Sequence, residues 1–315
     1  MGLPKPALRF LIQEHKRRPF SGSVVTLGRQ CVYATYDECV TMLRQEGITP
    51  QERIPPLERA TNIPHWRGTP RERFTSDVAF FSLLGVDECL AMDYSDYEGA
   101  TILADLNQPV AEELYERFDV IIDAGTLEHV FNIPCSLSNL ARMLRPGGRV
   151  VHMNPANNYV NHGFYQISPT LYADYYRANR FDDLHVYVGD ERLRGDVAGR
   201  IDLYELDPAH QPLLMYSHSR RRMVVYCVAT KTHESTADAI PTQSAYDATY
   251  AEFAQQPLAS DETAPRWWLS RLAWRVLPKA FYAWLRRQWI RFRARWIDPR
   301  RRYRPWGLRL ARRLE

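Results

Sequence analysis

The sequence predicts an α/β fold with a doubly wound, mostly parallel sheet and helices on both faces. Short apolar runs recur between residues 21 and 235, and segments with helical periodicity lie between them. Runs that are apolar at nearly every position are typical of strands buried on both faces, as in parallel sheets. Strands that alternate with helices predict the doubly wound arrangement, whose ligands bind at the carboxyl ends of the strands.

Seven apolar runs are the expected strands. They cover residues 23–27, 88–92, 100–103, 118–122, 148–153, 184–188 and 223–228. A helix that Thr75 caps and Gly85 ends precedes the second run, because threonine accepts hydrogen bonds from a first helical turn and glycine stops the last one. Another helix, apolar at Leu137 and Leu140, ends at Pro146-Gly147-Gly148, where proline breaks the helix and glycine permits the reversal.

Length and composition favour one large domain with appendages. The chain has 315 residues, of which 45% are hydrophobic, enough for a packed core. We expect a lead-in over 1–20, the α/β domain over 21–235 with an inserted loop at 48–74, a linker over 236–265 and a tail over 266–315. No apolar run approaches the roughly 18–20 residues of a membrane-spanning helix. The first residues lack the apolar centre of a secretory signal, so the expected location is the cytoplasm.

The basic charge of the chain is concentrated in the tail. Residues 266–315 hold 16 Lys and Arg against Asp298 and Glu315, a net charge of +14; the whole chain carries +4, so the other residues carry −10. Seven of the eight tryptophans also lie there. Tryptophan with arginine suits an anionic membrane surface, which would hold the protein peripherally at the inner face of the membrane. Nucleic-acid binding is less favoured, and packing of the tail on the acidic body stays an alternative.

Residues 118–153 carry the most informative motif. An apolar run ends at Asp123, Leu127-Glu128-His129-Val130 follows, and Leu144-Arg145-Pro146-Gly147-Gly148 precedes another apolar run. With these pieces at this spacing, the sequence resembles the class I S-adenosylmethionine-dependent methyltransferase superfamily, in particular its type 11-like domains. The resemblance implies a seven-stranded, Rossmann-like sheet with an antiparallel last strand. It also implies S-adenosylmethionine as cofactor and transfer of its methyl group to an acceptor that the sequence does not identify.

The resemblance further implies where the cofactor binds. Asp93, after the second run, takes the place of the acid that accepts hydrogen bonds from the ribose, and Asp96 is the second candidate. Asp105 and Leu106 take the place of the adenine contacts, although an Asx-turn explains Asp105 equally well. Asp123, at the end of the fourth run, is the remaining acid of the implied cofactor site.

The first motif departs from the family pattern. Where the family has a glycine-rich loop, this chain has one glycine, Gly28, after the run 23–27. Gly28 still permits a close approach to the backbone, and Arg29 could pair with the carboxylate of the cofactor's methionine part. The single glycine argues against a nicotinamide dehydrogenase. It leaves a non-catalytic binding module, or a membrane or nucleic-acid adaptor acting through the tail, as the alternative function.

The acceptor side of the implied site lies in the polar stretch after the run 148–153. His162 is the candidate general base, because an imidazole titrates near neutral pH. Tyr165, Glu128 and His129 complete the candidate catalytic group. Two residues, Glu128 and His129, do not make a metal site, and the five cysteines form no CxxC pair, so we expect no metal. A small molecule, or an acceptor linked to a glycan or lipid, is the expected substrate.

Overall fold

The computed structural model describes residues 2–51, 53–54, 58–61, 73–194, 198–206, 221–244, 246, 284 and 309–314. The chain divides into two units, and nearly all described residues belong to the first, which comprises Met1–Pro208, Ser219–Pro241 and Leu310–Glu315. Much of the predicted loop 48–74, and most of the linker 236–265 and of the tail 266–315, lies outside the described residues. Among the described helices, none combines the length and the apolar character needed to cross a membrane.

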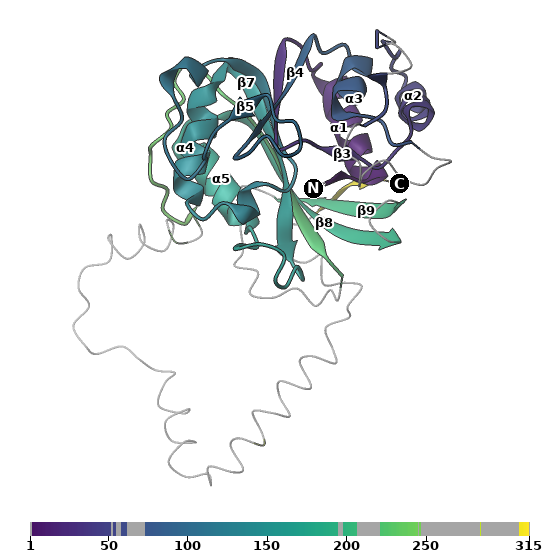
Figure 1. The fold of residues 1–315 in the computed structure, drawn as a ribbon. Helices are drawn as coiled ribbons and strands as arrows, with labels where there is room; N and C mark the ends of the chain where they lie inside the picture. The colour runs from purple at the N-terminus through teal and green to yellow at the C-terminus, as the bar shows by residue number, and fades with distance from the viewer. Residues whose placement is uncertain are drawn as a thin grey trace, which may run out of the picture. The chain divides into compact units, whose positions relative to one another are not determined.

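A mixed sheet of nine described strands forms the centre of the first unit (Figure 1). Its strand order is β11-β9-β8-β10-β7-β6-β2-β4-β5. The strands are β2 (Ser23–Leu27), β4 (Glu88–Asp93), β5 (Ile102–Leu103), β6 (Phe118–Asp123), β7 (Leu144–Asn157), β8 (Asp182–Arg194), β9 (Ala198–Glu205), β10 (Met223–Thr230) and β11 (Arg309–Leu314). A separate pair of short parallel strands joins β1 (Gly2–Leu3) to β3 (Cys31–Val32).

The predicted doubly wound order is confirmed in the parallel part of the sheet. Strands β5, β4, β2, β6 and β7 are parallel. The chain adds β4 and β5 on one side of β2 and then β6 and β7 on the other, so the strand order reverses at β2. In doubly wound sheets ligands bind at such a reversal, here outside the carboxyl ends of β2 and its two neighbours. Strand β10 is antiparallel to both β7 and β8, as the resemblance implied for the last strand.

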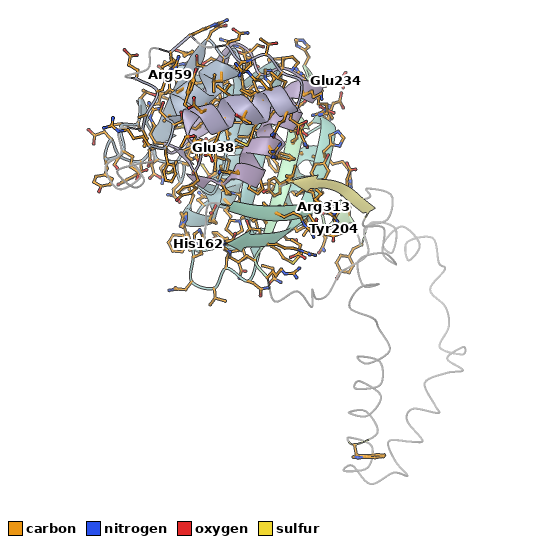
Figure 2. The ribbon with its side chains drawn as sticks, turned by 90° about the vertical axis from the view of Figure 1, so that its right-hand side faces the viewer. Glu38, Arg59, His162, Tyr204, Glu234 and Arg313 are labelled. Carbon is orange, nitrogen blue, oxygen red and sulfur yellow. The ribbon has the colours of Figure 1, made fainter. Side chains whose placement is uncertain are left out.

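The predicted number of seven strands is wrong, because β9 and β11 extend the sheet beyond β8. Strand β9 pairs with β8 in antiparallel register. Its buried acid Asp202 contacts Arg200 of the same strand at 3.0 Å and Arg313 of β11 at 3.1 Å. Arg313 on β11 and Tyr204 on β9 mark this edge of the sheet in Figure 2. Charged residues inside β9 conceal the strand from a search for apolar runs.

Helices cover both faces of the sheet, as predicted. Alternate residues of each central strand face opposite ways, so Val24 packs into one core and Val25 into the other. Helices α1 (Lys5–Arg17), α2 (Tyr36–Gln45) and α3 (Asp77–Leu83) supply the core on the Val24 side, and α4 (Ile133–Met143) and α5 (Pro169–Ala178) supply the other. Figure 1 shows the two helical layers on either side of the strands.

The expected lead-in over residues 1–20 is instead part of the domain. Helix α1 buries Phe10, Leu11 and Ile12 in the core together with Phe20. The guanidinium of Arg149, from β7, lies 4.3 Å from the ring centroid of Phe20 and is nearly inaccessible to solvent. Prolines and basic residues near this helix hide its apolar face in the sequence, while the contacts with the sheet stabilise it.

Two predicted helix boundaries change in the structure. Ser76, rather than Thr75, caps α3: its side chain accepts a hydrogen bond from the amide of Ala79 at 3.1 Å. The Pro146-Gly147-Gly148 segment is a bulge inside β7, since the register with β6 shifts between Phe118 and Val120. A Cβ on Gly148 would lie 2.9 Å from the Arg145 carbonyl oxygen, which is too close for a side chain, so the bulge needs glycine at that position.

Candidate functional site

Gly28 stands at the carboxyl end of β2, at the reversal of strand order. Its φ is +69°, in the left-handed region that favours glycine. A Cβ placed there would lie 3.4 Å from Asp93 Oδ2 and 3.8 Å from Thr126 Oγ1. The hydroxyl of Thr126 donates to the carbonyl oxygen of Leu27 at 2.7 Å, which ties the end of β6 to the end of β2. The ends of β2, β4 and β6 therefore place glycine backbone, a carboxylate and a hydroxyl side by side.

One carboxylate oxygen of Asp93 is bound to the backbone of the next residue. Its Oδ1 accepts a hydrogen bond from the amide of Tyr94 at 2.6 Å, which fixes the side chain at the strand end. The other oxygen, Oδ2, lies on the side of Gly28. Asp93 is half-buried, so its carboxylate can accept hydrogen bonds from a ligand in the crevice. The contact between Asp93 and the ribose stays a prediction.

Arg29 points to a protein carboxylate. Its Nη1 lies 3.3 Å from Oδ1 of Asp77, and its Nε donates to the carbonyl oxygen of Gly99 at 3.1 Å. Asp77 is buried and also accepts from the amide of Gln30 at 3.1 Å. The sequence pattern did not single out Asp77, because this acid lies 48 residues after Arg29, in the first turn of α3. Arg29 thus pairs with a carboxylate of the protein, and its predicted pairing with the carboxylate of the cofactor stays untested.

The predicted adenine contacts lie beyond β5. Oδ1 of Asp105 accepts from both the amide and the side-chain nitrogen of Asn107, each at 2.9 Å. These bonds form the Asx-turn that was the alternative interpretation of Asp105. Leu106 is buried, and its carbonyl oxygen accepts from Ser136 Oγ at 3.0 Å. Contact of these two residues with adenine stays a prediction.

Asp123 is fully buried at the end of β6. Its Oδ1 accepts from the amide of Thr126 at 3.0 Å, and its Oδ2 lies 2.8 Å from Nδ1 of His152. The other ring nitrogen of His152, Nε2, lies 2.6 Å from the hydroxyl oxygen of Tyr176, and the imidazole stacks on the ring of Tyr172. The carboxylate thus holds the turn after β6 in place, and its two oxygens face protein groups rather than the crevice.

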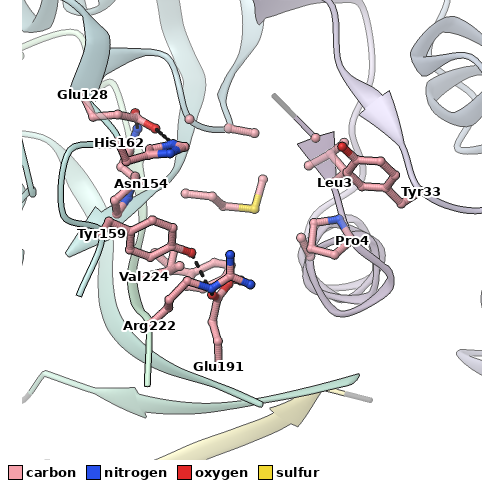
Figure 3. Close-up of a pocket in the computed structure, with 17 residues that line it drawn as sticks. Leu3, Pro4, Tyr33, Glu128, Asn154, Tyr159, His162, Glu191, Arg222 and Val224 are labelled. Atoms are coloured by element: carbon pink, nitrogen blue, oxygen red, sulfur yellow. Dashed lines mark hydrogen bonds and ion pairs between the residues drawn. The ribbon is translucent and has the colours of Figure 1, made fainter. Parts of the chain in front are cut away.

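A cavity of about 350 Å³ lies at the end of β7, next to this turn (Figure 3). Glu128 and His162 line one side of it, and Tyr159, Glu191 and Arg222 line another. The hydroxyl of Tyr159 donates to Glu191 Oε2 at 2.7 Å, and Nε of Arg222 lies 3.3 Å from the same oxygen. Figure 3 shows Glu128 and His162 pointing toward each other across this end of the cavity. The cavity combines an apolar wall with a polar centre, as small-molecule sites do.

Glu128 is the buried centre of the polar side. It lies in the short 3-10 turn Leu127–His129, and its side chain is 1% exposed. Oε2 accepts from Nδ2 of Asn154 at 3.0 Å, while Oε1 has no hydrogen-bond partner among the described residues. Burial, with the nearby charge of Asp123 as a smaller cause, raises the pKa of Glu128 to about 7. A carboxyl group of this kind changes its charge near neutral pH.

His162 joins Glu128 through the loop after β7. Phe164 and Tyr165 both donate their amides to the carbonyl oxygen of Glu128, at 2.8 and 3.2 Å. A Cβ on Gly163 would lie 2.7 Å from that oxygen, so only glycine lets the loop come this close. His162 Nε2 then lies 3.7 Å from Glu128 Oε1. The sequence offered a polar stretch here but no signal of its contact with the turn after β6.

The other predicted catalytic residues divide into two groups. His129 joins the cluster, with its Nε2 3.8 Å from Glu128 Oε1 and its ring centroid 5.2 Å from that of His162. Burial lowers the pKa of His129. Tyr165 donates a hydrogen bond from its hydroxyl to the carbonyl oxygen of Phe131 at 2.8 Å and does not line the cavity.

Two residues that no motif singled out, Asn154 and Tyr172, lie behind Glu128. The Tyr172 hydroxyl donates to Asn154 Oδ1 at 2.6 Å.

No family model matches the sequence, and no curated protein matches it. The chain is similar to several solved structures. The YcgJ protein from Bacillus subtilis is 12% identical with a TM-score of 0.38, over 72% of this chain and 98% of that one. A SAM-dependent methyltransferase from Archaeoglobus fulgidus is 11% identical with a TM-score of 0.37, over 71% of this chain and 94% of that one.

A third similar structure is the CMeT domain of the citrinin polyketide synthase, 10% identical with a TM-score of 0.36. The match covers 72% of this chain but only 52% of that domain, so the chain spans about half of its length.

Proposed function

We propose that this chain is a class I methyltransferase that transfers the methyl group of S-adenosylmethionine to a small-molecule acceptor. The observation that carries the proposal is the placement of Gly28 beside Asp93 at the reversal of strand order. Ligands of doubly wound sheets bind at this point. The cavity at the end of β7, with Glu128 in its wall, supplies a neighbouring place for the acceptor.

The residues at the strand ends fit the cofactor. The backbone at Gly28 permits a close approach, and Asp93 Oδ2 offers an acceptor for ribose hydroxyls. When bound, S-adenosylmethionine supplies a methyl group activated by its sulfonium. Because Arg29 already pairs with Asp77, it is a weaker candidate for the methionine carboxylate than the sequence suggested. Gly28 has no side chain, so nothing at this position of the turn comes between a ligand and Asp93 Oδ2.

The cavity would orient the acceptor. Methyl transfer is an in-line displacement, and holding the two reacting groups in line supplies much of the acceleration. Glu128 and His162 line the polar side of the cavity, with His129 beside them, and a hydroxyl or amine of the acceptor would lie against this group. The acceptor is proposed to be a small molecule, or the small head of a glycan- or lipid-linked substrate.

We also propose that the basic, tryptophan-rich tail attaches the protein peripherally to anionic membranes. The support is the net charge of +14 over residues 266–315 together with seven tryptophans. Cationic side chains near an anionic surface contribute about 1 kcal/mol each, and tryptophan favours the interface. Such attachment would bring the domain to a lipid-linked acceptor.

Titration calorimetry of the full-length protein with S-adenosylmethionine and S-adenosylhomocysteine tests the cofactor. We expect one site per chain, and an Asp93→Ala variant should lose about 1.5–3 kcal/mol of binding free energy, roughly ten- to more than a hundredfold in affinity. Asp96→Ala, three residues further along, is the matched control and should bind like the wild type. No heat and no thermal shift at millimolar ligand would remove the proposal.

Binding and catalysis are separated by a transfer assay. Cofactor labelled on the methyl group is incubated with the protein and a cell extract, and label in a small-molecule product supports the enzyme. Tight binding with no transfer to any extract fraction would instead support the non-catalytic binding module.

A further inference from the structure

Three ligand-type atoms converge at the end of the cavity. Glu128, His129 and His162 each offer one ligand atom, and these three atoms lie within 4.8 Å of one another. The carboxylate oxygen is 3.8 Å from the His129 nitrogen and 3.7 Å from the His162 nitrogen. Within the described part of the chain, this is the single group of three such side chains. It comes from two segments, the turn after β6 and the loop after β7.

A second observation points to a ligand at the same place. Glu128 Oε1 is buried and has no hydrogen-bond partner among the described residues. An unsatisfied buried carboxylate oxygen is costly, and such atoms are rare in folded proteins. Both imidazole nitrogens are too far away for a hydrogen bond. The oxygen therefore faces a position that the surrounding protein groups leave unfilled by any donor.

The spacing suits a metal ion. Two ligands bound tetrahedrally at about 2.0–2.1 Å from zinc lie roughly 3.4 Å apart. The observed distances of 3.7 and 3.8 Å exceed this by a few tenths of an ångström. The side chains of His129 and His162 are 40% and 44% exposed, so both rings have room to rotate onto an ion.

The carboxylate is held in place as a ligand needs to be. Asn154 Nδ2 donates to Oε2, and the Tyr172 hydroxyl fixes Asn154 in turn. Partners of this kind orient the groups that bind a metal and raise its affinity. They leave Oε1 directed toward the two histidines.

We propose that Glu128, His129 and His162 bind a divalent transition-metal ion, with its remaining coordination positions turned toward the cavity. Two imidazoles and one carboxylate suit ions such as zinc, cobalt and iron, whereas magnesium and calcium prefer oxygen ligands. The inference departs from the expectation of no metal, because the sequence showed two adjacent ligands and the third, His162, is 33 residues further on. If the proposed function holds, the open positions would orient an acceptor through an oxygen or nitrogen atom.

The test is metal binding by the full-length protein, purified without a polyhistidine tag and stripped with a chelator. Co²⁺ is titrated while its visible absorption is recorded, and Zn²⁺ is then added as a competitor. We expect one Co²⁺ per chain, displaced by Zn²⁺ and not by Mg²⁺ at the same concentration. His162→Ala and Glu128→Gln should each weaken Co²⁺ binding by more than about tenfold. The control His233→Ala, which removes an exposed histidine outside the cluster, should bind like the wild type.

His129→Ala is the variant that should stay folded even if the other two do not, because its exposed side chain can be removed without opening the core. It should also weaken Co²⁺ binding, at an unchanged melting temperature. The inference is overturned if wild-type protein shows no Co²⁺ spectrum at millimolar metal, or if the three variants bind Co²⁺ as the wild type does. Calorimetry with S-adenosylmethionine on the same samples distinguishes the two proposals. Cofactor binding without Co²⁺ binding removes the metal site alone, and Co²⁺ binding without cofactor binding removes the methyltransferase alone.

Discussion

The side-chain amide of Asn154 connects Glu128 to Tyr172. Its nitrogen donates to the Glu128 carboxylate and its oxygen accepts from the Tyr172 hydroxyl, so the amide orientation is fixed by both partners. Asn154 lies two residues after His152 on β7, and Tyr172 lies four residues before Tyr176 on α5, so the two residues of each element share one face. Tyr172 and Asn154 support Glu128, whereas Tyr176 and His152 support Asp123.

Tyr172→Phe tests this positioning role. Removing the hydroxyl frees the Asn154 amide to turn away from Glu128, so we expect turnover to fall while affinity for S-adenosylmethionine stays unchanged. One neutral hydrogen bond contributes about 0.5–1.5 kcal/mol, which predicts a loss of roughly two- to tenfold in kcat. Steady-state kinetics with a transferred label measures it.

Tyr176→Phe is the matched control. It removes an equally buried hydroxyl from the same helix, but one that contacts His152 rather than Asn154. Both variants should lose similar stability, and the Tyr172 variant should lose more activity. Equal activity in the two would show that Asn154 needs no support from Tyr172.

At the scale of elements, the loop after β7 decides where the second histidine lies. Asn158 and Asn161 adopt left-handed conformations, with φ of +62° and +60°, which asparagine tolerates better than most residues. Gly163 then passes against the backbone of Glu128, and the amides of Phe164 and Tyr165 donate to the carbonyl oxygen of Glu128. The loop is thus fixed to the turn after β6, and His162 is carried to the cluster by its backbone.

Gly163→Ala should therefore disturb the cluster without replacing any of its side chains. The added methyl would meet the Glu128 carbonyl oxygen at 2.7 Å, so the loop must move outward and take His162 with it. We expect weaker Co²⁺ binding and slower methyl transfer, with S-adenosylmethionine affinity retained. Val160→Ala, in the same loop at an 87% exposed position, is the control. Wild-type behaviour of Gly163→Ala would mean that the loop does not set the position of His162.

For the whole molecule, charge is divided between an acidic body and a basic tail. The last described strand, β11, complicates this division, since it lies within the tail yet belongs to the sheet of the first unit. Leu314 is fully buried, and Arg313 pairs with Asp202. Removing residues 266–315 would therefore remove a strand together with the tail, and residues 266–308 are the proper target for mutation.

Membrane attachment is tested by sedimentation with vesicles. Full-length protein should sediment with anionic vesicles at low salt and less so at high salt, because salt screens the charges, while tryptophan anchoring leaves a salt-resistant remainder. Replacing the arginines of residues 266–308 by glutamine should abolish the salt-sensitive part, and neutral vesicles serve as the lipid control. Protein that stays in the supernatant with anionic vesicles at low salt, or that prefers RNA in direct competition, contradicts the membrane proposal.

The sequence by itself determined the features that depend on neighbouring residues. Apolar runs located seven strands, their alternation with helices predicted the doubly wound order, and strand ends singled out Gly28 and Asp93. Local chemistry suffices for these, since burial on both faces and the turn preferences of glycine and proline are written in consecutive residues.

Only the tertiary structure decided which distant groups meet. It placed α1 in the core, added β9 and β11 through pairing that their charged residues conceal, and turned Asp123 inward to His152. It also brought His162 to Glu128 through backbone contacts of the intervening loop. A side chain's partner depends on strand register and on the path of a loop, which are set by the packing of segments far apart in the chain. For that reason the sequence contained every member of the Glu128 cluster but not their convergence.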